Sequence, residues 1–225
     1  MPKKKKGKEP DLVEETEETE DNSLQQMLFF EPSTEQSSSK IRILSLCGEI
    51  EEEKAGDICF SMIALREMGK EEVLENPEDE ESDLIEIYEP FTFNISTYGG
   101  SAVEMFAIYD TMRMVRRDCE IHTFGLGKVM SAGVLLLASG TKGKRKIGKN
   151  CRVMLHSVVA GSHGAIHNLE NEMEEIRVMQ EQHIDCLVEE TDMTKRYLKK
   201  LLNRKMNVYL TAEEAVELGI ADEVV

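Results

Sequence analysis

Hydrophobic residues between positions 41 and 225 fall into two patterns, short aliphatic runs and longer stripes with helical spacing. The short runs end at glycine or polar residues and predict strands. These runs occupy residues 41–47, 91–95, 119–124 and 152–155. The stripes repeat every three or four residues and predict helices. The helices are expected at residues 54–69, 101–117, 166–190 and 194–203. Strands that alternate with helices are typical of an α/β fold with largely parallel pairing.

Two shorter patterns complete the expected fold. Residues 131–139 are apolar and rich in Ala and Leu, so we expect a short buried helix there. Thr211 and Glu214 form the Thr-x-x-Glu pattern of a capping box, which opens one more helix that Gly219 closes. The long helix over residues 166–190 carries a single apolar stripe, and such a helix often meets another subunit.

Two segments lack both patterns. Residues 1–40 are rich in Lys, Glu, Thr and Ser, so we expect a disordered charged tail before a folded domain at residues 41–225. An apolar island at residues 24–30 either docks on a neighbouring surface or packs back on its own domain. Residues 70–89 form an acidic insert, whose run at 70–83 we interpret as a solvated loop, with a metal or partner site as the alternative.

The composition indicates which residue types form the hydrophobic core and which classes of partner are not expected. Hydrophobic residues make up 40% of the 225 residues, whereas aromatic residues make up 5%, Trp is absent and 13 residues are Met. The core must therefore be aliphatic and Met-rich. With 27 Lys and Arg against 44 Asp and Glu, the formal net charge is −17. A chain this acidic repels nucleic acid and anionic membranes, so neither is an expected partner.

The cysteines and the N-terminal segment indicate the cellular compartment in which the protein is expected. There are 5 Cys, an odd number, and no Cys-x-x-Cys occurs, so we expect buried free thiols in a reducing environment. No apolar run approaches the ~20 residues of a membrane-spanning helix. A basic run at residues 3–6 is not followed by the apolar stretch of a secretory signal. We therefore expect a soluble, cytoplasmic protein.

Three weak signals for chemistry follow one another along the chain. Gly99 and Gly100 end a predicted strand, where glycines either make a turn or let backbone amides approach a ligand. Ser131 precedes the short apolar helix, where it is either an N-cap or a nucleophile whose oxyanion meets the helix amides. His156 follows the strand at 152–155, where it is either a structural hydrogen-bonding residue or a general base.

The remaining histidines add no second site to this prediction. His163, His167 and His183 fall on polar or helical positions and are interpreted as surface residues, and His122 lies in a strand. Metal-binding spacing such as His-Glu-x-x-His is absent, and so is the Walker A motif of nucleotide-binding proteins. We therefore expect neither a metal nor another cofactor.

Taken in order, these motifs resemble the proteolytic subunit of the Clp protease. Ser-Thr-Tyr-Gly-Gly-Ser at residues 96–101 resembles the Asn-Ser-Pro-Gly-Gly-Ser turn of that family. Further similar segments lie at residues 107–112, 131–140, 142–145, 153–156 and 209–222. Several ordered matches between residues 41 and 225 are far more specific than any one of them. The resemblance implies a Clp/crotonase-like fold of repeated β-β-α units with a long protruding handle helix, its handle region at residues 161–205.

The resemblance also implies roles for particular residues. Ser131 would be the nucleophile and His156 the general base of a serine-type endopeptidase, with Asn207 at the third triad position. The backbone amides of Gly100 and Ala132 would form the oxyanion hole. The family further implies two stacked heptameric rings, a tetradecamer, that degrade unfolded polypeptides delivered by an ATP-dependent unfoldase partner.

Four features depart from the family pattern. Asn207 stands where the family has Asp, and an Asn can orient a His but cannot stabilise imidazolium with a full charge. Met206 replaces an Arg that helps to link the rings. Thr92 and Asn94 replace aromatic residues used for unfoldase docking. The acidic insert and the N-terminal tail are additional, and the island at residues 24–30 could replace part of the axial contact.

These departures keep alternative functions open. A catalytically impaired paralogue could fill ring positions beside active subunits, as Asn207 and Met206 suggest. A phage-type head-maturation protease or a signal-peptide peptidase relative would explain the diverged docking strand and the charged tail. An acyl-CoA-handling enzyme of the same superfamily would use the oxyanion hole but would not need the pair Ser131 and His156.

Overall fold

A seven-stranded, mainly parallel sheet organises the chain. The computed structural model describes residues 41–225 except residues 80, 162 and 204–205, so the predictions for residues 1–40, including the island at 24–30, lie outside the described residues. The strands are β1 (Ile43–Ile50), β4 (Phe91–Gly100), β5 (Ile121–Met130), β6 (Lys146–Ile147), β7 (Arg152–Leu155), β8 (Val208–Leu210) and β9 (Glu223–Val224). Their order is β1-β4-β5-β6-β9, with β7 beside β5 and β8 beside β7. All pairs are parallel except β7–β8, which confirms the predicted pairing.

Six helices connect or follow these strands in the described part of the chain. They are α1 (Glu52–Met68), α2 (Ala102–Val115), α3 (Ala132–Ala138), α4 (Ile166–Glu190), α5 (Lys195–Leu202) and α6 (Ala212–Glu217). Side-chain caps explain several helix starts, because a cap oxygen accepts from an amide that has no acceptor within the helix. Ser101 caps α2, Thr194 caps α5, and Thr211 with Glu214 forms the predicted capping box of α6.

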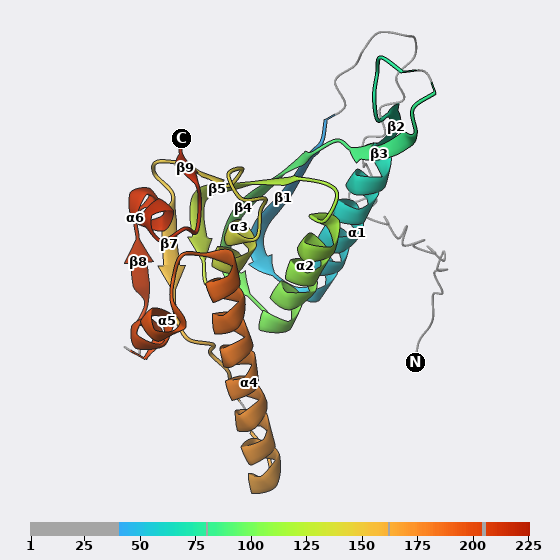
Figure 1. Ribbon diagram of the computed structural model, residues 1–225. Helices are drawn as coiled ribbons and strands as arrows, with labels where there is room; N and C mark the ends of the chain where they lie inside the picture. The colour runs from blue at the N-terminus through green and yellow to red at the C-terminus, as the bar shows by residue number, and fades with distance from the viewer. Residues whose placement is uncertain (1–40, 80, 162, 204–205) are drawn as a thin grey trace, which may run out of the picture. The chain divides into compact units, whose positions relative to one another are not determined.

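The core lies between one face of the sheet and the helices. Along β4 burial alternates, so that Phe91, Phe93 and Ile95 are fully buried while the intervening residues are half-buried. Helices α1, α2 and α3 lie in front of the sheet in Figure 1. Every residue of α3 is buried, because this helix is enclosed by β4, β5, α2 and α4. The end of β5 and the start of α3 are therefore held from several sides.

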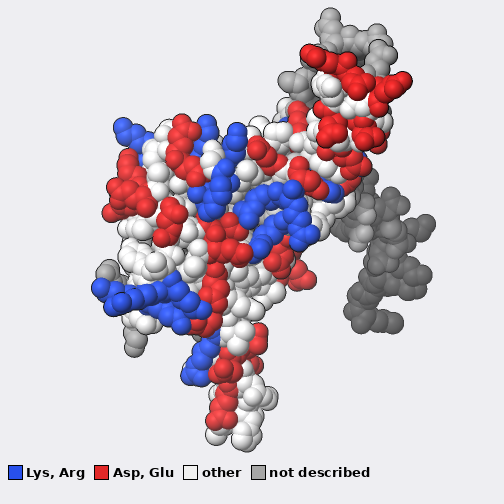
Figure 2. Space-filling model, viewed as in Figure 1, with Lys and Arg blue, Asp and Glu red and all other residues white. Residues whose placement is uncertain are grey.

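The acidic insert is a β-hairpin and not the predicted loop. Strands β2 (Lys70–Leu74) and β3 (Leu84–Tyr88) pair antiparallel, and Lys70 forms a 2.6 Å ion pair with Glu86 across them. Most of the hairpin is exposed, and Figure 2 shows acidic residues gathered over it at the upper right. The prediction missed the strands because charged residues mask the β-branched and aliphatic positions, such as Val73 and Ile85, that face one another in the pair.

Helix α4 has two different halves. Ile166 and Met173 on its first half are 72% and 54% exposed, and this half extends away from the sheet in Figure 1. On its second half the buried side chains are His183, Ile184, Leu187 and Glu190. The expectation that His183 is a surface residue is therefore wrong. His183 lies four residues before Leu187, so a helix places both on the same buried face.

Charged groups anchor the buried half of α4. The Glu190 side chain is 2% exposed and accepts two hydrogen bonds, of 2.9 and 2.8 Å, from the guanidinium of Arg116. Arg145 donates to the backbone oxygen of Glu190 at 2.8 Å, and Tyr109 Oη donates to the Glu190 carboxylate at 3.2 Å. A buried charge without such partners would be strongly destabilising. These bonds set the position of α4 relative to α2 and α3.

The cysteines are free, but they are not uniformly buried. Cys119 and Cys151 are buried, Cys59 and Cys186 are half-buried, and Cys47 is exposed. Burial raises the pKa of the Cys151 thiol to about 11, which disfavours the reactive thiolate. The expectation of buried thiols is thus wrong for Cys47, because it follows the fully buried Leu46 along β1 and so points to the opposite, exposed face of the strand.

Candidate active site

Ser131 occupies a strained position between β5 and α3. Its φ of 54° and ψ of −123° make it the single non-glycine residue with positive φ in the described part of the chain. Such a backbone costs free energy and persists where surrounding structure enforces it, which is frequent at functional sites. Its side chain does not cap α3. The N-cap alternative for Ser131 therefore does not describe what its hydroxyl does.

The hydroxyl of Ser131 meets the imidazole of His156. The distance between Ser131 Oγ and His156 Nε2 is 2.7 Å, and both residues are half-buried. Parallel pairing of β5 with β7 places Met130 opposite Met154, and the Ser131 amide donates to the Met154 oxygen at 2.7 Å. The two residues that follow these strand ends thus lie side by side. This contact is the hydrogen bond that an activated serine nucleophile requires.

Gly99 allows β4 to approach Ser131 closely. A Cβ at Gly99 would lie 2.6 Å from Ser131 Cβ and 3.0 Å from the Met130 oxygen, and the φ of Gly99 is +101°. No side chain fits in that space, and the backbone angle also favours glycine. Gly99 is therefore a site of close backbone approach to Ser131, and approach of the glycine amides to a ligand stays a prediction.

Gly100 and Ala132 lie beside the same serine. Both line a pocket of about 310 Å³ together with Ser131 and His156. Ala132 is the first residue of α3, so its amide has no acceptor within the helix. The Ser101 amide donates to the Ile50 oxygen on β1 at 3.0 Å. Neighbouring amides of an extended strand point to opposite sides, so the amide of Gly100 faces away from β1.

Asn207 lies next to His156 in the strand register. Leu155 and Val208 are the last paired residues of β7 and β8, and the next residues along the two strands are His156 and Asn207. Asn207 is exposed, and no hydrogen bond joins it to His156 among the described residues. Its role as third triad member stays a prediction.

His183 completes the pocket from the side of α4, a residue that sequence reasoning did not assign to the site. It is 6% exposed and lines the pocket that contains Ser131 and His156. Burial, reinforced by nearby His156, lowers the pKa of His183 to about 4. The ring is therefore neutral at pH 7. Its spacing to Leu187 on a predicted amphipathic helix was the signal that could have identified it as buried.

The described residues also bear on two other kinds of site. Among the described residues, no group of three or more His, Cys, Asp or Glu gathers as a metal site requires. Within the same residues, no helix is long and apolar enough to cross a bilayer.

Comparisons with known proteins identify the family of this chain. A family model described as Clp protease matches residues 80–225. ATP-dependent Clp protease proteolytic subunit 1 of Corynebacterium glutamicum is 34% identical over 184 residues, which cover 81% of this chain and 78% of that relative. The subunit 1 protein of Thermobifida fusca is also 34% identical, over 81% of this chain and 73% of its own. Proteolytic subunit 2 of Corynebacterium jeikeium is 33% identical, over 81% and 78%. The chain described here belongs to the Clp protease family.

Proposed function

We propose that this Clp-type peptidase subunit is a serine endopeptidase that cleaves unfolded polypeptides into short peptides. The observation that carries the proposal is the 2.7 Å contact between Ser131 Oγ and His156 Nε2. A strained backbone at Ser131 and the pocket beside it support the same function. Together they provide a nucleophile, a base and a space for substrate.

Acylation begins with proton transfer from Ser131 to His156. As Ser131 Oγ forms a bond to the scissile carbonyl carbon, His156 Nε2 takes the hydroxyl proton. The carbonyl oxygen becomes an oxyanion, and the amides of Gly100 and Ala132 donate to it. Collapse of this intermediate breaks the C–N bond, and His156 returns the proton to the leaving amine. An acyl ester on Ser131 remains.

Deacylation repeats these steps with water as the nucleophile. His156 takes a proton from water as the water oxygen attacks the ester carbonyl. The same two amides donate to the oxyanion that forms, and on its collapse Ser131 Oγ leaves with the proton from His156. In this scheme the Asn207 side-chain oxygen would accept a hydrogen bond from the other ring nitrogen of His156.

The partners proposed for the chain follow from its family. The relatives are named proteolytic subunits of an ATP-dependent protease. We propose that the exposed half of α4, with Ile166 and Met173, contacts other subunits in stacked heptameric rings in the cytoplasm. An ATP-dependent unfoldase would deliver substrate. Because Thr92 and Asn94 lie on the half-covered face of β4, any docking there would use polar contacts.

A ring-filling subunit with impaired catalysis is the second candidate. The exposure of Asn207, without a hydrogen bond to His156 among the described residues, favours it. In a serine protease, an Asn at the third position lowers the rate by about 10⁴, largely through the wrong imidazole tautomer. Such a subunit would assemble normally but cleave peptides slowly.

Active-site labelling together with native mass tests the proposal. A fluorophosphonate probe is expected to label the wild-type chain within its ring complex and not to label Ser131→Ala. The matched control is Ser139→Ala, because Ser139 is a buried serine whose hydroxyl donates to the Leu135 oxygen at 2.6 Å. Labelling of Ser131→Ala, or none of assembled wild type, would overturn the proposed activity. Assembly without labelling would favour the ring-filling subunit.

A further inference from the structure

The segment after His156 separates two cavities. Ser157 and Val158 line the pocket beside Ser131, and both also line a second cavity of about 560 Å³. The other residues that line the second cavity belong to α4 and to the end of α5. Residues 157–159, which we call the strap, therefore have open space on both sides of their first two members.

Few bonds hold the strap in place. Within the described part of the chain, no backbone–backbone hydrogen bond involves residues 157–159. Two side-chain contacts hold the strap instead. Ser157 Oγ donates to the Leu202 oxygen of α5 at 3.0 Å, and the Val158 amide donates to Gln180 Oε1 of α4 at 2.7 Å. A segment with so few bonds shifts at low free-energy cost, and the second cavity gives it room to do so.

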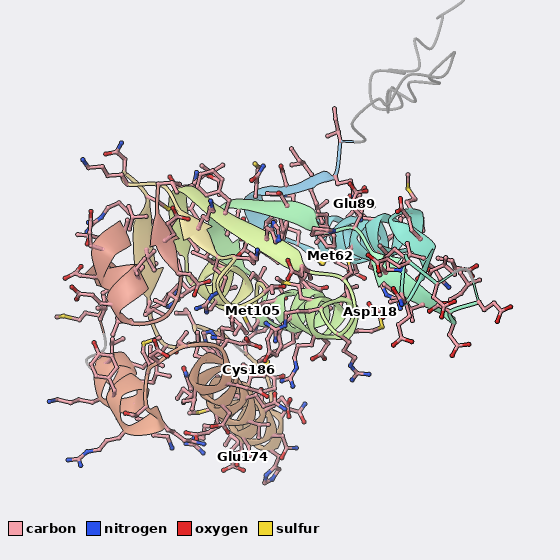
Figure 3. All side chains as sticks on the ribbon, turned by 45° about the horizontal axis from the view of Figure 1, so that its top comes forward. Met62, Glu89, Met105, Asp118, Glu174 and Cys186 are labelled. Carbon is pink, nitrogen blue, oxygen red and sulfur yellow. The ribbon has the colours of Figure 1, made fainter. Side chains whose placement is uncertain are left out.

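Gln180 belongs to a fixed part of α4. It is half-buried and lies midway along the helix between Glu174 and Cys186, both of which Figure 3 labels. One turn later, Ile184 is 3% exposed and belongs to the hydrophobic core. Close packing of the core holds this part of the helix in one position. The Gln180 oxygen therefore gives Val158 a fixed point of attachment.

The orientation of the Gln180 side chain has a cost. Because the Val158 N–H is a donor, the Gln180 atom that meets it must be the oxygen. The amide nitrogen Nε2 of Gln180 is then left buried without a hydrogen-bond partner in the described part of the chain. A buried donor without a partner destabilises a fold, and a methionine of similar length would avoid that cost. Packing alone does not explain a glutamine here, whereas the bond to Val158 does.

We propose that Gln180 is a positioning residue for substrate, whose side-chain oxygen holds Val158, and through it the strap, at the pocket that receives the polypeptide. The inference rests on the proposed peptidase function. Val158 and Val159 both line that pocket, and Val159 is 79% exposed. The strap therefore presents aliphatic side chains to a bound chain, and its position decides how well they fit.

The chemistry depends less on this bond than substrate binding does. The contact between Ser131 Oγ and His156 Nε2 is set by the pairing of β5 with β7, which ends before the strap begins. Loss of the Gln180 oxygen should therefore weaken peptide binding while the nucleophile and its base stay in place. A residue that only stabilised the fold would affect both.

Two substitutions at residue 180 test the inference. Gln180→Met keeps the length of the side chain but removes the oxygen. For a fluorogenic peptide with aliphatic residues on both sides of the scissile bond, it is expected to raise KM about tenfold and to change kcat less than about twofold. Gln180→Glu keeps an oxygen that accepts from the Val158 amide, and Arg177 and Lys199 line the same cavity as countercharges. This variant is expected to recover the KM of wild type.

The controls separate this effect from a general loss of stability. Gln182→Met carries the same substitution at an exposed position on α4, and its KM should follow wild type. The rate at which a small fluorophosphonate probe labels Ser131 should be the same in Gln180→Met as in wild type. An unchanged KM in Gln180→Met, no recovery in Gln180→Glu, or a loss of labelling as large as the change in KM would overturn the inference. If Gln180→Met does not fold, Gln180→Asn replaces it, since its oxygen lies one carbon short of the Val158 amide.

A binding measurement keeps the inference separate from the proposed activity. Fluorescence anisotropy of the same peptide on Ser131→Ala is expected to show about tenfold weaker binding when Gln180→Met is added, and recovery with Gln180→Glu. If wild type cleaves no peptide but this binding difference is present, the proposed function fails and the role of Gln180 stands. If wild type cleaves peptides but neither KM nor binding depends on residue 180, the role of Gln180 fails and the function stands.

Discussion

The two walls of the pocket are built in different ways. The wall from the sheet places Ser131, Ala132, His156 and the Gly99–Gly100 pair at strand ends. There the strand pairing fixes the backbone, and a Cβ added at Gly99 would lie only 2.6 Å from Ser131 Cβ. The wall from α4 is held by helix packing and contributes His183, a buried imidazole that burial keeps neutral. The sheet wall is therefore suited to chemistry, and the helix wall closes the pocket with an uncharged ring.

The two walls differ in how tightly they position their side chains. A nucleophile and its base must be held within a fraction of an ångström, and parallel strands that end side by side achieve this. A wall built by helix packing instead buries its side chains, and burial sets the charge state of an imidazole such as that of His183. The predictions below test the two walls separately, from the largest expected effect to the smallest.

Removal of the base tests whether the sheet wall acts as one unit. His156→Ala is expected to lower kcat for a fluorogenic peptide by about 10⁶-fold, because Ser131 then lacks the group that takes its proton. The double variant Ser131→Ala with His156→Ala should be no slower than either single variant. Effects that multiply in the double variant would show that the two residues do not act together.

Crowding the nucleophile tests the close approach of β4. Gly99→Ala is expected to lower kcat by about 10²-fold or more, because its new methyl group would displace Ser131. Gly143→Ala is the matched control, since Gly143 also has a positive φ, +79°, but has nothing within 4 Å of an added Cβ. Steady-state kinetics of the two variants, with thermal unfolding measured alongside, separate displacement of the nucleophile from backbone strain. Equal losses of kcat would contradict the role given to Gly99.

Acid sensitivity tests the burial of the helix wall. His183 has a pKa of about 4 in the fold and about 6.5 in an unfolded chain, so the unfolded state binds more protons between these values. Stability therefore rises with pH in this window and falls as pH drops from 6.5 toward 4. Between pH 7 and pH 5, wild type should lose about 2 kcal/mol more unfolding free energy than His183→Met.

Urea unfolding at the two pH values measures this difference. The matched control is His167→Met, because the His167 side chain lies on the same helix and is 94% exposed. Equal pH dependence of wild type and His183→Met would contradict the burial of a neutral imidazole in this wall.

Restoring an acid tests the third position of the sheet wall. Asn207→Asp is expected to raise kcat about tenfold or more, because a carboxylate beside His156 would stabilise the imidazolium that forms during the reaction. Asn150→Asp adds the same charge at an exposed turn before β7 and should leave kcat at the wild-type value. A kcat of Asn207→Asp at or below wild type would remove Asn207 from the catalytic machinery.

Much of the fold follows from local patterns. The helix predicted at residues 166–190 matches α4 in both bounds, and the capping box at Thr211 and Glu214 is present. These features depend on spacing within one segment, which the sequence states directly. The hairpin of residues 70–88 was missed because its strands stabilise each other across the pair, and neither segment alone has a clear strand pattern.

The candidate site was predictable only in part. Ser131 and His156 were identified through resemblance to a family, since each signal alone has a common structural explanation. Their 2.7 Å contact required the parallel pairing of β5 with β7, which joins residues 25 positions apart. The register also brings Asn207 beside His156 without a hydrogen bond between them in the described part of the chain.

The sequence by itself determined the alternation of the main strands and helices, the acidic charge of −17 and the candidate nucleophile and base. Only the tertiary structure decided that His183 is buried beside them and that Gly99 has no room for a side chain. The physical reason is that periodicity reports which face of an element is apolar, whereas a pocket is made by several elements at once. A polar residue on a buried face can be assigned to a pocket only when the elements that form the opposite wall are known.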